Sequence, residues 1–411
     1  MAKLTLHKQT LANMNEICAW FANKKETLSH PIYSSYDIRD SGYKISNVDA
    51  NIFPAGFNNI CPTDKETSIG LMEKYITNHY GSAVKNILLV TEEHTNNAYY
   101  WENVHTIRNL IEAGGRTVKV AIPRELPEPL TITSSAGNEV ILHSALKDGS
   151  LLKTFTPDLI ISNNDFSEAY EDWAKTVTEF PMNPPRELGW YQRKKSTYFK
   201  YYNQLVNEFA EITKIDPFLM RVETELFEHF DITDEASRNA LAERVDAMLA
   251  RLREDYKARG ITQEPFVFVK NNAGTYGLAV IRVGSGAEVK EWSYKSRKKM
   301  KAAKGGRDVE EVIIQEGIPS IVESDGASAE PVIYMIGTEL AGGFLRTHAE
   351  KGNTDSLNSP GAVYKRLCVS DLAINTPGCP QENVYGWTAK LGLLAIALEA
   401  QELHATFKGY K

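Results

Sequence analysis

FVFVKNNAGTYGLAVIRV, residues 266–283, is the segment of this 411-residue chain that says most about its fold. Its two apolar runs predict two strands, and the short loop between them contains two glycines. Lys270 ends the first strand and places a compact cation beside that loop, whose backbone N–H groups can bind phosphate oxygens. We interpret the segment as a phosphate-binding loop between two strands. Its candidate nucleotide contacts are Lys270, Gly274, Thr275, Tyr276 and Gly277.

Two familiar phosphate-binding motifs do not fit this segment. It is not a Walker loop, because no Gly-Lys-Ser or Gly-Lys-Thr opens a helix, and it is not a dinucleotide fingerprint, because a strand follows the glycines. When the segment is taken alone, a glycine-tipped β-hairpin with a surface lysine explains it equally well. The neighbouring segments therefore decide the interpretation.

A second segment, EVIIQEGIP at residues 311–319, is an apolar strand that ends in Gln315 and Glu316 and is interrupted by a glycine and a proline. This form suits an interdomain hinge whose backbone binds the edge of an adenine ring, with Glu316 on the ribose hydroxyls. More often than a hinge, such a pattern is simply the end of an ordinary strand. The candidate nucleotide contacts here are Gln315, Glu316 and Ile318.

Between these two segments lies the basic stretch KSRKKMKAAKGG, residues 295–306. Such a stretch is most often a solvated face. Its position before the hinge also suits a mobile lid over a triphosphate.

A third segment, GGFLRTHAEKGNTDSLNSPGAV at residues 342–363, is a strand that presents Arg346 and His348, followed by a polar loop. The planar guanidinium of Arg346 can bind a carboxylate or a phosphate in a bidentate manner, although a surface ion pair is the alternative. We take His348 as a candidate nucleotide contact and Asn358, in the loop, as a candidate substrate contact.

The order of these segments resembles the ATP-grasp superfamily, and in detail it is similar to eukaryotic glutathione synthetases, in which the magnesium-binding strand has moved to the front of the chain. The resemblance implies an α/β protein with an ATP-grasp fold in this glutathione synthetase-like, permuted arrangement. It also implies that ATP and Mg²⁺ are the cofactors.

A matching metal strand lies near the N-terminus, in VDANIFPAGFNN at residues 48–59. By this resemblance Asp49 and Asn51 are metal ligands, and oxygen ligands one residue apart on a strand face suit Mg²⁺. An Asx-rich turn is the alternative. Glutathione synthetases of this type also have a metal-binding glutamate four residues after the lysine, where this chain has Gly274. Asn271 or Asn272 through water, or a carboxylate elsewhere, would have to replace it.

The chain is more similar still to the proteobacterial glutamate-cysteine ligases of ATP-grasp type. The similar stretches are residues 36–59, 159–167 and 189–199 together with the nucleotide segments. This resemblance implies an ATP-dependent ligase that joins the γ-carboxylate of L-glutamate to the α-amino group of L-cysteine through an acyl phosphate, the first step of glutathione biosynthesis.

The same resemblance implies roles for residues outside the nucleotide segments. Arg39 would stabilise the acyl phosphate, and Arg346 would bind a substrate carboxylate, so both are candidate catalytic residues. Arg193 and Lys195 are candidates for the α-carboxylate of glutamate, against an equally good interpretation as surface charge. The candidate substrate contacts are Arg39, Asn58, Asn59, Arg193, Lys195 and Asn358.

The order of predicted elements divides the chain into five parts. An apolar strand at 86–91, a helix at 97–112 and a strand at 117–122 predict a βαβ unit with a parallel sheet. The parts are an N-terminal segment with the metal strand and substrate loop (1–85), an α/β substrate-binding domain with a parallel sheet (86–185), a helical connection (186–264), an ATP-grasp lid subdomain (265–320) and the C-terminal part of the catalytic core (321–411).

Composition excludes several classes of protein. Hydrophobic residues make up 42% and charged residues 24%, as in folded soluble proteins, and the formal net charge of -7 argues against nucleic acid as a main partner. The longest apolar run, Leu391–Leu398, is too short to span a membrane, and the polar N-terminus contains no signal peptide. We therefore expect a cytoplasmic enzyme with small-molecule substrates. Its oligomeric state, homo-oligomer included, is left open.

Two other functions remain open at this stage. One is a different ATP-grasp carboxylate-amine ligase, such as a glutathione synthetase, which would share the ATP residues but use another acceptor. The other is a non-catalytic protein that binds a nucleotide or an amino acid, which the glycine at position 274 would favour.

Overall fold

The computed structural model describes residues 2–93, 96–146, 150–274, 279–292, 309–374 and 381–411, together with residues 296, 298 and 300. The predicted contacts Thr275, Tyr276 and Gly277 lie outside these residues, as does most of the basic stretch 295–306. Within the described ranges, no helix combines the length and the apolar character needed to cross a membrane.

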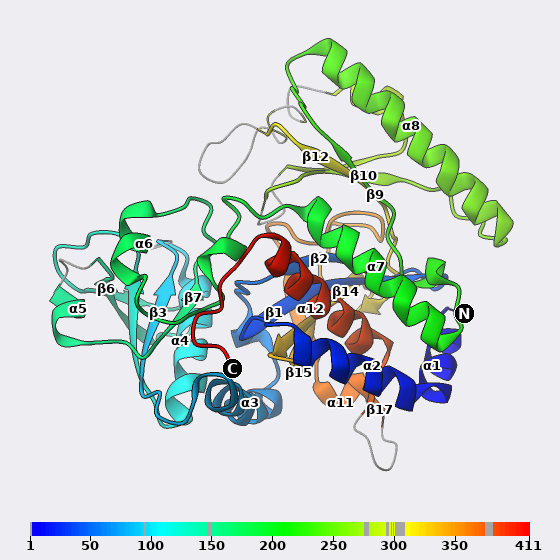
Figure 1. Ribbon diagram of the computed structural model, residues 1–411. Coiled ribbons are helices and arrows are strands. Elements are labelled where there is room, and N and C mark those ends of the chain that lie inside the picture. The colour runs from blue at the N-terminus through cyan, green and yellow to red at the C-terminus, as the bar shows by residue number, and fades with distance from the viewer. Residues whose placement is uncertain are drawn as a thin grey trace.

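An antiparallel sheet at the centre of the molecule joins the two ends of the chain (Figure 1). Its strand order is β16-β15-β14-β1-β2, so the N-terminal hairpin pairs with a strand almost 300 residues away in sequence. Residues 33–49 alternate in a strand-like way around a turn at Ser41-Gly42, and the β1–β2 hairpin confirms the strands that this pattern predicts. The strands are β1 (Tyr33–Asp40), β2 (Ile45–Asn51), β14 (Ala327–Ile336), β15 (Glu339–Thr347) and β16 (Val363–Leu367).

Helices cover one face of this central sheet. The most buried of them, α12 (Val384–Glu402), contacts β1, β2 and β14. A Cβ at Gly392 would lie 2.5 Å from Cδ1 of Tyr36, so only glycine permits this close approach. Against α12 pack α7, α2 and α1, which are Lys195–Thr213, Met14–Thr27 and Ala2–Ala12.

The amphipathic pattern of residues 8–27 predicts one N-terminal helix, but this prediction is wrong in one respect, because the structure has two helices, α1 and α2, in this part of the chain. Asn13 separates α1 from α2 with φ of -120°. Its side-chain amide donates to the carbonyl oxygens of Gln9 and Thr213. An asparagine side chain that bonds backbone groups in this way competes with helix hydrogen bonds, which explains the break.

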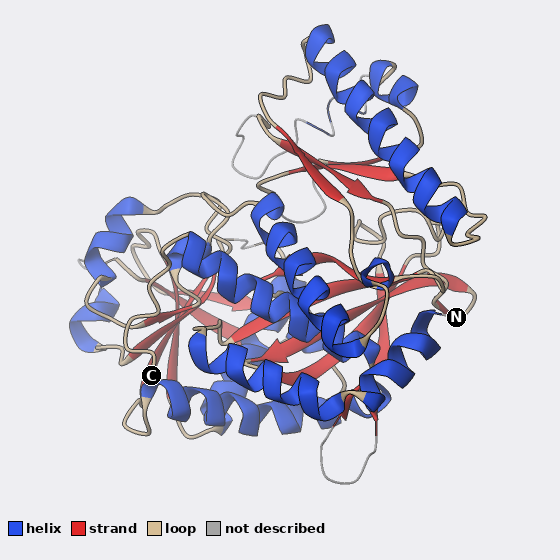
Figure 2. Cartoon of the chain, turned by 45° about the vertical axis from the view of Figure 1, so that its right-hand side comes forward, coloured by secondary structure: helices blue, strands red, loops and turns tan. Residues whose placement is uncertain are grey.

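A second antiparallel sheet, with the order β11-β10-β12-β9, forms a separate unit above the central sheet (Figures 1 and 2). We call this unit, residues 224–316, the lid. Three of its strands were predicted; β9 was not. Its elements are β9 (Thr224–Phe227), α8 (Glu235–Ala258), β10 (Val267–Asn271), β11 (Val280–Val283), α9 (Gly286–Lys290) and β12 (Val312–Glu316).

A third sheet lies at the opposite end of the central sheet from the lid helix α8 (Figure 1). Its order is β5-β6-β4-β3-β7-β8, and β3 pairs in parallel with both β4 and β7. The polar residues that follow β3 and β7 therefore meet at one edge. The elements are β3 (Asn86–Thr91), α4 (Ala98–Ala113), β4 (Thr117–Ile122), β5 (Leu130–Thr133), β6 (Glu139–Ser144), β7 (Leu159–Asn163) and β8 (Met182–Asn183).

One long helix, α3 (Pro62–Tyr80), was not predicted. Two of its buried positions carry Asp64 and Ser68, so its buried face has no clear apolar period. Pro62 at its first turn was the available signal. The remaining short elements are η1 (Phe57–Asn59), α5 (Ser150–Thr154), α6 (Glu171–Val177), η2 (Arg186–Leu188), η3 (Pro217–Leu219), β13 (Glu323–Ser324), α11 (Val369–Leu372), β17 (Ala373–Ile374) and β18 (Gln381–Glu382).

Candidate active site

One face of the central sheet forms the floor of the candidate site. Asp37 on β1 is the direct cross-strand partner of Asp49 on β2, and Glu330 on β14 is the partner of Arg346 on β15. Directly paired residues point to the same side of a sheet, and so do residues two positions apart on one strand. Asn51 therefore joins the two aspartates on this face.

Two cavities meet above this floor. The lid cleft lies between the lid strands and the central sheet, and the sheet cavity, of about 680 Å³, extends toward the third sheet. Lining residues of the lid cleft include Arg39, Val48, Phe268, Lys270, Gln315 and Ile318. Lining residues of the sheet cavity include Phe53, Asn58, Asn59, Tyr100, Trp190 and Arg346. Both cavities are lined by Asp37, Asp49, Gly274 and Asn358.

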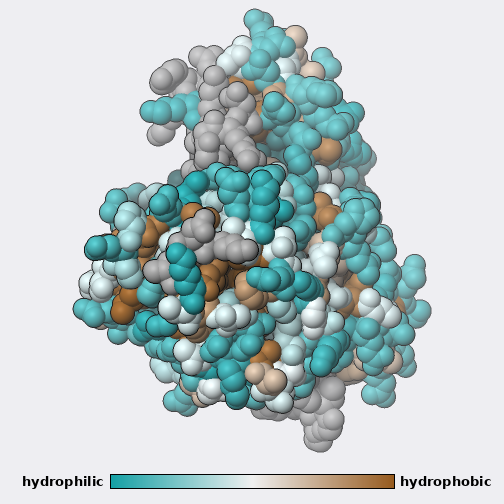
Figure 3. Space-filling model, turned by 60° about the vertical axis from the view of Figure 1, so that its left-hand side comes forward, coloured by the Kyte–Doolittle hydropathy of each residue, from teal (hydrophilic) through white to brown (hydrophobic). Residues whose placement is uncertain are grey.

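The outer surface contrasts with these cavities. On the face shown in Figure 3 most of the surface is hydrophilic, and hydrophobic residues gather mainly within a hollow in the lower part of the molecule. Mixed apolar walls with a few charged groups are typical of small-molecule sites.

Lys270 lies where the phosphate-binding hypothesis requires it, at the end of β10 and inside the lid cleft. Its Nζ donates to Oε1 of Gln315 at 2.6 Å and to the carbonyl oxygen of Val48 at 3.1 Å. Burial lowers the pKa of Lys270 to about 8, although Asp49 acts in the opposite direction. A cation with so few polar partners is well placed to bind an anion.

Asp49 carries the negative charge at the junction of the two cavities. Its Oδ1 accepts a hydrogen bond from Nζ of Lys195 at 2.5 Å, and its side chain remains 38% exposed. The protein around it raises the pKa of Asp49 by desolvation, but Lys195 and Lys270 outweigh this effect and hold the pKa below its ordinary value. Asp49 is therefore ionised at neutral pH and available to a cationic ligand.

A chain of buried ion pairs continues from the floor of the site. Nη1 of Arg346 donates to Asp37 at 2.6 Å and to Glu330 at 2.8 Å. Nε of Arg39 donates to the other oxygen of Glu330 at 2.5 Å. Desolvation raises the pKa of Glu330, but the two arginines dominate and lower it. The remaining guanidinium nitrogens of Arg39 bind the carbonyl oxygens of Asn353 and Asp355.

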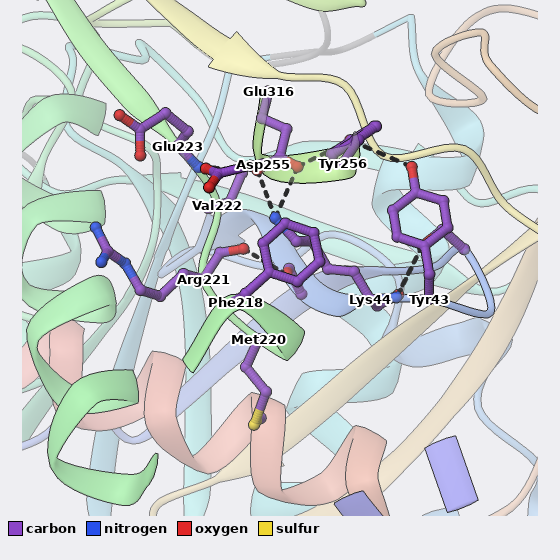
Figure 4. A network of polar contacts seen from close by, with 12 residues as sticks. Tyr43, Lys44, Phe218, Met220, Arg221, Val222, Glu223, Asp255, Tyr256 and Glu316 are labelled. Carbon is purple, nitrogen blue, oxygen red and sulfur yellow. Dashed lines mark hydrogen bonds and ion pairs between the residues drawn. The ribbon is translucent and has the colours of Figure 1, made fainter. Parts of the chain in front are cut away.

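Glu316, the predicted ribose contact, lines the lid cleft, but its carboxylate is bound by other residues of the protein (Figure 4). Both carboxylate oxygens accept from Nζ of Lys44 at 2.7 Å, and the carboxylate also accepts from the hydroxyl of Tyr256 and the backbone N–H of Glu223. The Lys44 ammonium lies 4.0 Å from the centre of the Phe218 ring. Glu316 thus ties the lid to the turn between β1 and β2, and its carboxylate is already engaged.

Two further predicted contacts lie away from both cavities. Arg193 is 1% exposed and pairs with Glu399 at 2.9 Å inside the protein, so it does not line a substrate cavity. His348 accepts from the backbone N–H of Glu350 and bonds the carbonyl oxygen of Pro360, which orders the polar loop. The physical reason is the same for both: each side chain has its partners within the protein.

The two amides named as substitutes for the missing loop carboxylate are also used internally. Oδ1 of Asn271 accepts from the backbone N–H of Ala273. Asn272 accepts from the N–H of Ser196 and donates to Glu311. Asp37 provides the carboxylate on the same face as Asp49, and sequence reasoning missed it.

Four residues that line the sheet cavity each have a buried polar side-chain atom with no hydrogen-bond partner in the described part of the chain. These atoms are Oδ1 of Asn58, Nε1 of Trp190, Nε of Arg346 and Oγ of Ser359. Trp190, Ser359 and Glu330 were not predicted as site residues, because a single sequence does not tell which side chains a cavity collects.

Comparison with known proteins identifies the family. The family model described as glutamate-cysteine ligase matches residues 7–400. The chain belongs to the glutamate-cysteine ligase family. This ligase is ATP-dependent and uses L-glutamate, L-cysteine and ATP as substrates, as predicted. As predicted, the reaction that it catalyses is the first step of glutathione biosynthesis.

One solved structure similar to the ligase supports the assignment. A crystal structure from Methylobacillus flagellatus KT, provisionally described as a gamma-glutamylcysteine synthetase, is 33% identical, covers 97% of this chain and 96% of its own, and has a TM-score of 0.86. A D-cycloserine synthetase is 14% identical with a TM-score of 0.37, covering 78% of this chain and 82% of its own. The latter similarity is too weak to bear on the ligase. No curated protein sequence matches it significantly.

Proposed function

We propose that the ligase is built on an ATP-grasp fold in the permuted arrangement, with ATP in the lid cleft and the amino-acid substrates in the sheet cavity. The observation that supports this proposal most directly is that Asp37 and Asp49 line both cavities. The γ-phosphoryl group of ATP and the γ-carboxylate of glutamate would then meet beside these aspartates. Phosphoryl transfer requires this kind of positioning more than any covalent help from the protein.

The nucleotide end of this arrangement rests on the lid. Phe268 and Ile318 line the lid cleft and would supply apolar walls for an adenine. Lys270 would bind the phosphates. Because Glu316 is held by Lys44, we assign it to fixing the hinge and not to the ribose.

The donor set at the floor fits Mg²⁺. Asp37, Asp49 and Asn51 offer oxygen ligands on one sheet face, and hard oxygen ligands are those that Mg²⁺ prefers. Oδ1 of Asn51 already accepts from the N–H of Phe53, and a second lone pair remains on that oxygen. We propose these three residues as the ligands. A bound divalent cation would neutralise charge on the triphosphate and the transferring group.

The amino-acid end of the site would use the sheet cavity. Arg346 projects from β15 into it, and its neighbours Trp190 and Ser359 also offer donors that lack partners. We propose that these groups bind a substrate carboxylate after small side-chain rotations. The unpartnered Oδ1 of Asn58 is an acceptor suited to a substrate ammonium group.

The chemistry then takes two steps. A carboxylate oxygen of glutamate attacks the γ-phosphorus of ATP, and ADP leaves from an acyl phosphate. The amino group of cysteine next attacks the acyl carbon, and inorganic phosphate leaves as the amide forms. Lys270 and Lys195 flank Asp49 and would stabilise negative charge on the transferring group in the first step. Arg39, held by Glu330, lies in the lid cleft beside the same position.

Phosphate release tests the assignment of substrates and intermediate together. ATP with glutamate alone should give at most slow release, and addition of cysteine should produce stoichiometric phosphate and amide. Glutamate labelled with ¹⁸O in its γ-carboxylate should transfer one label to phosphate if the acyl phosphate forms. Phosphate without the label would contradict the intermediate, and a preference for γ-glutamylcysteine plus glycine would contradict the substrate pair.

A further inference from the structure

Outside the candidate active site, the described residues contain a buried cluster of two cysteines and an aspartate. The sulfur atoms of Cys61 and Cys368 and a carboxylate oxygen of Asp64 all lie within 4.8 Å of one another. Cys61 is 4% exposed and Cys368 is 3% exposed. No step of the mechanism proposed above uses either thiol.

The two cysteines lie next to two separate segments that line the sheet cavity. Cys61 caps α3 and directly follows the loop with Asn58 and Asn59. Cys368 directly follows β16, whose first residues, Val363 and Tyr364, line the same cavity. Their side chains meet beside the two segments.

The polar surroundings of the two sulfurs differ. Nε of Arg366 donates to Sγ of Cys368 at 2.7 Å, and this contact raises the pKa of the Arg366 guanidinium. The contact places a guanidinium where it can stabilise negative charge that develops on the sulfur of Cys368 during a reaction, so Cys368 is the better placed of the two as nucleophile. Burial, together with the neighbouring Cys368, raises the pKa of the Cys61 thiol, so Cys61 stays protonated.

The arrangement favours oxidation over metal binding. The Arg366 guanidinium already supplies the positive charge beside Cys368, and Oδ2 of Asp64 already accepts from the backbone N–H of Val369 at 2.9 Å. A metal ion would have to share both sulfur and carboxylate with these groups. A disulfide would leave both of these contacts in place, and it requires the two sulfurs to approach to about 2 Å with a Cβ–S–S–Cβ dihedral of about ±90°.

We propose that Cys61 and Cys368 are a modification site at which a hydroperoxide forms a reversible disulfide, and that this bond restrains the wall of the sheet cavity. The sulfur of Cys368 attacks one oxygen of hydrogen peroxide and gives up its proton, the O–O bond breaks, and the departing hydroxide takes up that proton and leaves as water. The Cys61 sulfur then attacks the sulfenic sulfur, an S–S bond replaces the S–O bond, and the second water leaves with the proton of Cys61.

The functional consequence follows from the positions of the two residues. A bond between them fixes the loop before α3 relative to the end of β16. Because Asn58 and Tyr364 lie on these segments, the KM for glutamate or cysteine should change while the KM for ATP does not. This part rests on the proposed use of the sheet cavity by amino acids, whereas the thiol chemistry does not.

The test uses the full-length enzyme, reduced and then exposed to hydrogen peroxide. We expect loss of two of the four thiols and a non-reduced peptide pair linking Cys61 to Cys368, both reversed by dithiothreitol. Cys61→Ser and Cys368→Ser should each prevent the cross-link, and serine is a good helix cap, so folding should survive; melting temperature checks this. Cys18→Ser, a half-buried cysteine on α2, is the matched control and should leave the cross-link intact.

Three outcomes would overturn parts of the inference. If the thiols are oxidised but the cross-linked peptide is not found, the proposed disulfide does not form. If the purified enzyme contains one equivalent of zinc, and this zinc protects both thiols from oxidation, the cluster is a metal site. If the cross-linked enzyme keeps its KM values for glutamate and cysteine, the disulfide does not restrain the cavity.

Discussion

Asp37 and Asp49 are direct cross-strand partners on the β1–β2 hairpin, and their side chains lie at the junction of the two cavities. Two carboxylates held side by side repel each other unless cations lie close. Arg346 forms an ion pair with Asp37, and Lys195 forms one with Asp49. Burial raises the pKa of Asp37. At Asp49 the cations Lys195 and Lys270 outweigh desolvation and lower the pKa, so Asp49 is the more firmly ionised carboxylate at the point where a divalent cation and a transferring phosphoryl group would be bound.

Asp49→Asn should lower kcat by about 100-fold or more, because it removes a charged ligand from the point where charge develops. The melting temperature should change little, since the side chain is partly exposed. Coupled assays over a range of Mg²⁺ concentrations measure the effect. Asp172→Asn, with its side chain 97% exposed, is the matched control and should behave as wild type. Normal turnover of the Asp49 variant would remove this residue from the metal site.

Lys270 should make ATP affinity depend on pH. Its pKa in the folded protein is about 8, below the ordinary 10.5, because burial disfavours the ammonium. As pH rises through about 8 the charge is lost, and the Kd for ATP should increase. Over the same interval the free enzyme should gain stability, because the unfolded chain then binds more protons than the folded one.

Calorimetric titrations with a non-hydrolysable ATP analogue between pH 7 and pH 9, a range chosen to span about one unit on each side of that pKa, check this prediction. Lys270→Met should weaken binding and flatten the pH dependence, whereas Lys175→Met, an exposed substitution on α6, should do neither. An unchanged affinity in Lys270→Met would favour the simple hairpin interpretation of the segment.

Lys44→Met should destabilise the protein by about 3 to 5 kcal/mol, because it leaves Glu316 buried without its cation. Combining it with Glu316→Gln should recover part of the loss. Lys365→Met removes an exposed pair with Asp325 and should leave the free energy of unfolding almost unchanged. Denaturant unfolding gives the values. If Glu316→Gln alone abolished ATP binding at full stability, the carboxylate would act on the nucleotide after all.

L-2-aminobutyrate should replace cysteine as a slower acceptor. The acceptor must supply an amino group and a small apolar side chain, and an apolar pocket separates similar side chains by only about 1 to 3 kcal/mol. Glycine should fail with free glutamate. Amide formation measured with each acceptor gives the ratios of kcat/KM. A complete failure of L-2-aminobutyrate would mean that a specific contact binds the sulfur.

Much of the local structure could be predicted from the sequence. The spacing of apolar residues predicts β3, α4 and β4, and Gly114-Gly115 predicts where α4 ends. The observed bounds of these elements agree with the predicted ones to within about one residue. The helix α3 was missed because Asp64 and Ser68 occupy buried positions. Lys270, Gln315 and Asp49 were identified as site residues, and the structure places all three around the lid cleft.

The sequence by itself determined the strand and loop motifs of this ligase, because the spacing of lysine, glycines and carboxylates along a strand is a local property of the chain. Only the tertiary structure decided which charged groups are available to ligands. Arg193 and Glu316 look like exposed site residues in the sequence, but Glu399 and Lys44, more than 200 residues away from them, neutralise each inside the protein. A buried charge takes whichever partner the fold brings within reach, and one sequence does not reveal that partner.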